Sequence, residues 1–178
     1  MEIRKLEQLT HNPTLEWGTN GYETDTIYVI SAIGTEHSFE FSIREKKQPY
    51  IKSRDMGPDD IAALNPIIKQ GHSFGVFHNE ELIGWVICDF RTCNNSLFIK
   101  DMLISEAYRR QNVGRLLIKA VNREARKLNC RIVEVEAQNT NYPAIQFYRN
   151  CGFMFTGINT KRYADSAETA VLMSYDLI

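Results

Sequence analysis

The stretch from Ile99 to Gly114, IKDMLISEAYRRQNVG, contains the residues whose types and order best suit the binding of an anion. A largely apolar run ends near Ser105, a turn with two adjacent arginines follows, and an amphipathic segment begins near Asn112 or Val113. Backbone N–H groups at a helix start, the helix dipole and arginine side chains together stabilise a phosphate. The stretch therefore predicts a phosphate site, with a plain solvated turn as the alternative. It is neither a Walker loop nor a G-x-G-x-x-G dinucleotide turn.

Carboxylates in strand-like segments are the next candidates for chemistry. Asp101 interrupts a largely apolar run, which is unusual for a buried strand, although such a side chain can also point outward. Glu134, Glu136 and Gln138 alternate with apolar residues and therefore share one strand face. That face predicts either a cleft that attracts a cationic molecule, with Glu136 as a possible base, or a solvated acidic surface.

A sheet and helices must position these residues, and the hydrophobic pattern predicts both. Apolar alternation and β-branched residues predict strands over 26–33, 39–43, 73–77, 82–90, 96–105, 131–138, 153–163 and 169–178. Helices are expected from residue 58, from residue 112 or 113, and over 142–151. Pro66 should kink or shorten the first helix, and residues 1–24 predict no element. The order predicts an α/β (α+β) fold with a mixed sheet.

Length and composition predict one domain over residues 1–178. The 178 residues are 43% hydrophobic and 24% charged, which is ordinary globular composition. The formal charge of −1 gives no global basic field and predicts no nucleic-acid partner. No segment resembles a signal peptide or a membrane span, so the sequence predicts a cytoplasmic protein without a membrane partner.

The four cysteines and four histidines do not form a recognisable site. The cysteines form no C-x-x-C pair, and no histidine lies at a zinc-ligand spacing from any of them. The sequence therefore predicts free thiols and no metal. No cysteine has a histidine nearby in the sequence, so a covalent route has no good candidate nucleophile. The histidines lie near turns or strand boundaries and receive no role.

Two segments in the expected order resemble the GNAT superfamily of acetyl-CoA-dependent N-acetyltransferases. YRRQNVG resembles the family signature Q/R-x-x-G-x-G/A, which falls on residues 109–114, and NYPAIQFYRNCGF, residues 141–153, resembles a later family motif. Asn112 stands where the family has its first glycine, but asparagine also tolerates positive φ. The resemblance is clearest over residues 72–178. It implies a GNAT-like mixed, mostly antiparallel sheet flanked by helices.

The resemblance also implies site roles, with acetyl-CoA as co-substrate. An alkyl ammonium must lose a proton before it attacks a thioester, and the leaving thiolate must gain one. The resemblance makes Tyr148 the acid, with ring packing in the core as the alternative. Asp101, directly or through water, is the candidate base, and Glu136 is the other candidate. The residues expected to bind the co-substrate are Met102, Leu103, Ile104, Arg109, Arg110, Gln111, Asn112, Val113, Gly114, Arg115, Asn141 and Tyr148.

Within the superfamily, the chain resembles the streptothricin acetyltransferases at EAQNTNYPAIQFYRNCGF, at TGINTKRY and, more weakly, at PYIKSR. This likeness predicts direct acetyl transfer to a primary amine of a small cationic molecule such as streptothricin, with antibiotic resistance as the cellular outcome. The alternatives are a GNAT enzyme acting on an aminoglycoside, a polyamine or a protein amine, and a non-catalytic CoA-binding regulatory module. The resemblance leaves a homodimer open, and residues 1–50 receive no role.

Overall fold

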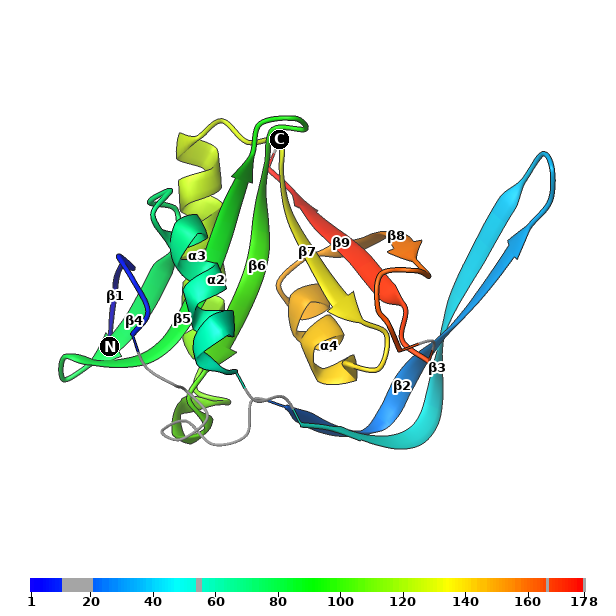
Figure 1. The fold of residues 1–178 in the computed structure, drawn as a ribbon, viewed down its shortest axis with the longest axis horizontal. Coiled ribbons are helices and arrows are strands. Elements are labelled where there is room, and N and C mark those ends of the chain that lie inside the picture. The colour runs from blue at the N-terminus through cyan, green and yellow to red at the C-terminus, as the bar shows by residue number, and fades with distance from the viewer. Residues whose placement is uncertain (11–20, 54–55, 166, 178) are drawn as a thin grey trace. The chain divides into compact units, whose positions relative to one another are not determined.

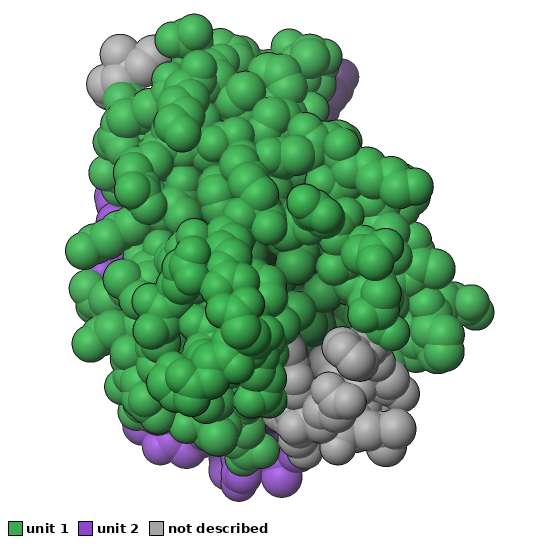
Figure 2. Space-filling view, turned by 90° about the vertical axis from the view of Figure 1, so that its left-hand side faces the viewer, with its two compact units in different colours: residues 1–20, 53–135, 174–178 green, residues 21–52, 136–173 purple. Residues whose placement is uncertain are grey.

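The computed structural model describes residues 1–10, 21–53, 56–165 and 167–177, and the chain forms two compact units (Figures 1 and 2). The first unit comprises Met1–Asn20, Ser53–Val135 and Ser174–Ile178, and the second comprises Gly21–Lys52 and Glu136–Met173. The organisation of residues 1–178 as one domain stays a prediction. None of the helices in the described ranges has the length and apolar character needed to cross a bilayer.

The described strands form a seven-stranded sheet and a separate two-stranded sheet. The larger sheet has the order β1-β4-β5-β6-β7-β9-β8. Its strands are β1 (Glu2–Lys5), β4 (Phe74–His78), β5 (Glu81–Arg91), β6 (Ser96–Ile104), β7 (Ile132–Gln138), β8 (Met154–Asn159) and β9 (Ala170–Asp176). Strands β1, β4, β5 and β6 pair antiparallel, whereas β6 and β7 pair parallel. The predicted hairpins and mixed sheet are confirmed, and β1 lies where the sequence predicts no element.

Helices cover both faces of β5 in the first unit. Trp85 and Ile87 of β5 lie in an apolar cluster with Ile61 and Leu64 of α2 (Pro58–Ile68). Val86, on the opposite strand face, is also completely buried, and β5 contacts α3 (Val113–Lys127) as well. Because both faces are covered, the sequence of β5 is a nearly continuous apolar run rather than an alternating one.

The second unit contains the hairpin of β2 (Tyr22–Gly34) and β3 (Phe39–Lys52), helix α4 (Tyr142–Asn150), β8 and most of β9 (Figure 1). The prediction that one face of the second hairpin strand lies in the core is wrong, because Phe39 and Phe41 are 63% and 42% exposed. Alternation identifies an apolar face, but it does not say whether another element covers that face.

The middle of the hairpin is fixed to the rest of the second unit through Tyr28 of β2, which pairs with Glu45. The Tyr28 N–H donates to the Asn139 carbonyl at 2.9 Å, and Asn139 Nδ2 donates to the Tyr28 carbonyl at 2.7 Å. The Tyr28 ring also lies 5.3 Å from the ring of Tyr142 and 5.7 Å from that of Phe155, between centroids. These contacts connect β2 directly to the segment that precedes α4.

Candidate active site

A bulge interrupts β6 next to the candidate base. The register pairs Ile87 with Asp101 but Cys88 with Ile99, so Lys100 is an extra residue in β6. In the described part of the chain, the parallel ladder between β6 and β7 ends at the pair Ile99 and Val135. The residues predicted to bind the pantetheine arm, 102–104, therefore follow the end of that ladder. A strand edge beyond its ladder suits main-chain pairing with an extended ligand.

The predicted phosphate turn follows β6 directly. Its first part is a short 3-10 helix, Glu106–Tyr108, and Arg109 Nε then donates to the Ile104 carbonyl at 3.1 Å. Arg110 and Asn112 both have φ of 63°, so the asparagine adopts the positive φ expected of it. Helix α3 begins at Val113, as predicted. The turn thus presents exposed Arg110 beside a helix start, where backbone N–H groups lack partners within the helix.

Asp101 has a specific partner that the sequence did not identify. Trp85 Nε1 donates to Asp101 Oδ2 at 2.7 Å, and Trp85 is only 2% exposed. Trp85 lies opposite Leu103, so Trp85 and Asp101 are diagonal neighbours on the same strand face. Asp101 is itself half-buried. The available signal was the indole N–H of a tryptophan on an apolar strand, which needs an acceptor when it is buried.

Tyr148 and Asn141 lie on α4 and at its start. Tyr148 is 7% exposed, and its ring contacts the rings of Phe147 and Phe153 edge-on, at centroid distances of 5.2 and 5.4 Å. Asn141 is the N-cap, and its Oδ1 accepts from the Ala144 N–H at 3.2 Å. The ring of Tyr148 packs in an apolar cluster, and the role of its hydroxyl as an acid stays a prediction.

The polar residues that share one face of β7 have different environments. Glu134 accepts hydrogen bonds from the buried Ser96 hydroxyl and, at 2.9 Å, from Asn94 Nδ2. It therefore connects β7 to the start of β6, and its carboxylate is half-buried. Glu136 accepts from Arg162 Nε at 2.9 and 3.2 Å and from the Tyr163 hydroxyl at 3.1 Å. Burial and the adjacent Glu136 carboxylate raise the pKa of Tyr163 well above its usual range.

The predicted site residues are distributed over both units. Asp101, residues 102–104 and residues 109–115 belong to the first unit, whereas Glu136, Asn141 and Tyr148 belong to the second. Within the first unit, β6 and the turn after it bring the predicted base and most of the predicted co-substrate ligands onto one continuous segment.

Comparison with known proteins decides the family. The model of the acetyltransferase (GNAT) family matches residues 36–153, which is more than half of the chain. This chain belongs to the acetyltransferase (GNAT) family. It is an acetyl-CoA-dependent N-acetyltransferase, as the two sequence motifs predicted.

The relatives of this GNAT chain include named acetyltransferases. It is 31% identical over 161 residues to the streptothricin acetyltransferase of Streptomyces lavendulae, covering 86% of this chain and 83% of that protein. The nourseothricin acetyltransferase structure matches with a TM-score of 0.73 and 23% identity, over 99% of this chain and 98% of that one. A Bacillus anthracis acetyltransferase, solved with acetyl coenzyme A, matches with a TM-score of 0.70 and 21% identity, over 98% and 96% of the two chains.

These matches confirm the GNAT-like fold and the co-substrate. The mixed, mostly antiparallel sheet with flanking helices is the predicted fold class, and acetyl-CoA is the predicted acetyl donor. The first unit of the GNAT chain fits such a donor on two observations: β6 continues past the end of its ladder with β7, and an arginine-containing turn precedes α3. Extended backbone suits a long flexible arm, and the turn suits a pyrophosphate.

Proposed function

We propose that this enzyme transfers an acetyl group to a primary amine of a small cationic molecule of the streptothricin class. The observation that carries the proposal is the 31% identity to the Streptomyces lavendulae streptothricin acetyltransferase, because the alignment covers 86% of this chain. An alignment of that length includes segments of both compact units rather than the co-substrate motif alone. It therefore bears on the acceptor as well as on acetyl-CoA.

Residues of the first unit bind the acetyl donor in this proposal. Acetyl-CoA supplies the acetyl group as a thioester. The main chain of Met102, Leu103 and Ile104 holds its pantetheine arm. The backbone N–H groups and side chains of residues 109–115 hold the pyrophosphate, with the positive end of α3 adding to the attraction. The family resemblance also assigns Asn141 and Tyr148 to acetyl-CoA.

Proton transfer is assigned to three side chains. Asp101 accepts the proton of the acceptor ammonium, directly or through water, and the hydrogen bond from Trp85 fixes the orientation of its carboxylate. Tyr148 donates a proton to the departing sulfur. Glu136 is the weaker candidate base, because its carboxylate already accepts hydrogen bonds from Arg162 and Tyr163.

Direct transfer, without an acyl-enzyme, agrees with the state of two of the four thiols. Cys88 and Cys130 are buried, and burial raises the pKa of both. A buried thiol of raised pKa is a poor nucleophile at neutral pH.

The test is thiol release from acetyl-CoA over a panel of amines: streptothricin, an aminoglycoside, a polyamine and a peptide with a free N-terminus. The proposal expects the highest kcat/KM with streptothricin and an acetylated product by mass spectrometry. A higher kcat/KM on any other panel member would overturn the assigned acceptor class. Binding of acetyl-CoA in a thermal shift, without thiol release on any amine, would instead identify a non-catalytic module.

A further inference from the structure

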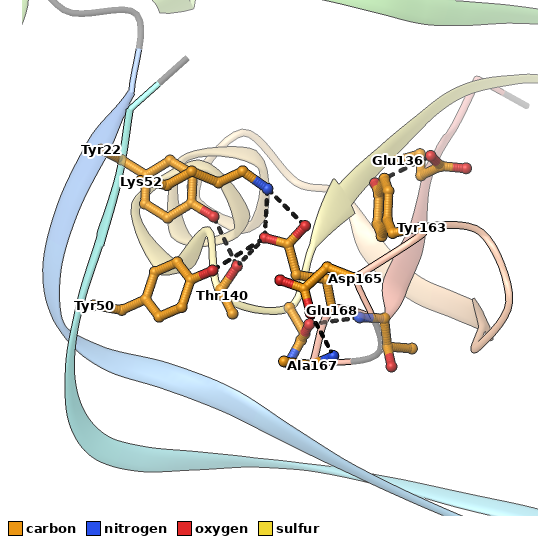
Figure 3. A network of polar contacts seen from close by, with 11 residues as sticks. Tyr22, Tyr50, Lys52, Glu136, Thr140, Tyr163, Asp165, Ala167 and Glu168 are labelled. Carbon is orange, nitrogen blue, oxygen red and sulfur yellow. Dashed lines mark hydrogen bonds and ion pairs between the residues drawn. The ribbon is translucent and has the colours of Figure 1, made fainter.

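Glu168 is the most buried carboxylate among the described residues of the second unit, and it lies at the centre of a polar network (Figure 3). Its residue exposure is 3%. Lys52 Nζ lies 2.6 Å from both carboxylate oxygens. The Thr140 hydroxyl donates to Oε1 at 3.1 Å, and the Tyr50 hydroxyl lies 3.4 Å from the same atom. The network therefore joins the end of β3, the segment before α4 and the segment before β9.

The hydrogen bonds of this network run in one direction. Thr140 has one hydroxyl proton, which it donates to Glu168, so the Tyr22 hydroxyl is the donor in its 2.7 Å contact with Thr140. Burial raises the pKa of Tyr22 well above its usual range, so Tyr22 keeps the proton that it donates. The rings of Tyr22 and Tyr50 stack with their centroids 6.1 Å apart. The start of β2, through Tyr22, and the end of β3, through Tyr50 and Lys52, are thus both connected to Thr140 and Glu168.

Thr140 connects this network to helix α4. The residue before it, Asn139, is bound by Tyr28 of β2 on one side and by Thr169 on the other. The Thr140 carbonyl accepts from the Tyr142 N–H at 2.9 Å, and Asn141 caps the helix. The position of the first turn of α4 therefore depends on contacts made by residues 139–141. Tyr148 lies on the same short helix, which ends at Asn150.

We propose that Lys52 and Glu168 are positioning residues for the acetyl-transfer step, acting through the start of α4 on Tyr148. The inference rests on the proposed role of Tyr148 as the acid. A proton donor must be held within hydrogen-bond reach of the atom that it protonates, and a displacement of about 1 Å can cost about a hundredfold in rate. The ion pair fixes the Glu168 carboxylate, which holds the Thr140 hydroxyl in place. Thr140 in turn fixes the position of the first residues of α4.

Replacing one member of the pair has a predictable physical result. Lys52→Met keeps the aliphatic stem but leaves the Glu168 carboxylate buried without its cation, so we expect the carboxylate to turn toward water. That movement removes the acceptor of the Thr140 hydroxyl. Lys52→Met/Glu168→Gln removes both charges while the amide oxygen can still accept from Thr140. The double variant is therefore expected to be less impaired than Lys52→Met alone.

The kinetic test measures kcat and both KM values for these variants with streptothricin as acceptor. Lys52→Met is expected to lower kcat about tenfold to a hundredfold and to change the acetyl-CoA KM by a smaller factor. The double variant is expected to recover kcat to within about threefold of the wild type. Wild-type kcat in Lys52→Met, or no recovery in the double variant, would overturn the proposal.

A second experiment tests whether Lys52→Met lowers kcat through Tyr148 or through another part of the enzyme. In the Tyr148→Phe background, adding Lys52→Met should lower kcat less than about twofold further, because the step that it impairs is already lost. Fully additive losses would show that the pair acts elsewhere and would overturn the positioning role. Wild-type turnover in Tyr148→Phe alone is a different result, because it removes Tyr148 as the acid.

Amide exchange gives a readout that does not depend on catalysis. Lys52→Met should accelerate exchange of the amides of Tyr142 and residues 144–148, and the double variant should restore their protection. Lowered turnover with unchanged exchange in α4 would contradict the proposal even if Tyr148 is the acid. Accelerated exchange that the double variant reverses shows that the pair holds the start of α4, and it supports the positioning role if Tyr148→Phe also lowers turnover.

Discussion

Each compact unit contains a buried glutamate paired with a lysine, and the two pairs are built alike. Glu124 of α3 is 8% exposed, with Lys5 Nζ at 2.6 Å and His72 Nδ1 at 3.1 Å. Glu168 is 3% exposed, with Lys52 Nζ at 2.6 Å. The lysine side chain is 44% exposed in the first pair and 30% exposed in the second. Both pairs therefore combine a buried carboxylate with a partly solvated ammonium.

The two pairs differ in what they connect. Lys5 belongs to β1, and Glu124 lies in the C-terminal half of α3, away from the turn that begins this helix. Lys52 and Glu168 contact the segment from which α4 starts, and α4 contains Tyr148. Burial and pairing alone therefore do not indicate a functional role. The elements that a pair joins decide whether its loss changes stability alone or turnover as well.

The largest effect is expected at the candidate base of the first unit. Asp101→Asn should lower kcat about a hundredfold, because the amide cannot accept the substrate proton. Glu136→Gln in the second unit should lower kcat less than about tenfold, because that carboxylate already accepts hydrogen bonds from Arg162 and Tyr163. Steady-state rates with streptothricin at saturating acetyl-CoA measure both. The reverse order of the two losses would assign the base to Glu136.

A smaller effect is expected at the phosphate turn, and it should appear in binding. Arg109→Ala removes a guanidinium and its hydrogen bond to the Ile104 carbonyl, so the acetyl-CoA Kd should rise about tenfold. The kcat at saturating acetyl-CoA should stay within about twofold of the wild type. The matched control is Arg123→Ala, which removes an exposed arginine further along α3. Calorimetry that finds equal Kd values for the two variants would remove Arg109 from the site.

The smallest effect is expected from Glu124, and it depends on pH. Burial raises the pKa of Glu124, but hydrogen bonds from Lys5 and His72 outweigh it, and the net pKa is lowered. A lowered folded-state pKa stabilises the fold above the unfolded value of about 4.3, and this stabilisation is lost as the pH falls through the folded value. Glu124→Gln should therefore lower the melting temperature at pH 7 by about 2–4 °C.

The same two proteins should have converging melting temperatures as the pH falls below the unfolded value of about 4.3 and through the lowered folded value, where Glu124 of the wild type takes up a proton. Glu7→Gln, at an exposed carboxylate, is the control and should change the melting temperature little at either pH. A constant difference between the wild type and Glu124→Gln across this range would contradict the assigned ion pair.

Local signals explain what the sequence could predict. The run from β4 to β6, the turn after it and the start of α3 follow from apolar alternation, turn residues and an amphipathic repeat, all of which act over a few residues. The positive φ of Asn112 likewise follows from a property of that side chain. The first strand, EIRK, is only four residues long and has no apolar period, so nothing in its residues predicts a strand.

Non-local contacts explain what the sequence could not predict. Trp85 and Asp101 become partners only through the register of β5 and β6, and that register includes a bulge. Lys52 and Glu168 are 116 residues apart, and Thr140 is 28 residues from Glu168. The segment PYIKSR, which weakly resembles the streptothricin acetyltransferases, contains Tyr50 and Lys52, but its residue types do not indicate that Glu168 is their partner. The exposure of Phe39 and Phe41 depends in the same way on which elements cover the hairpin.

The most direct measurement compares kcat for Lys52→Met and Lys5→Met at saturating acetyl-CoA and streptothricin, with each preparation normalised by its acetyl-CoA binding capacity. Both substitutions remove the cation of a buried glutamate, so both should lower the melting temperature. Lys52→Met should lose at least about tenfold in kcat, whereas Lys5→Met should stay within about twofold of the wild type. Equal losses of kcat in the two variants would contradict the distinction between the pairs.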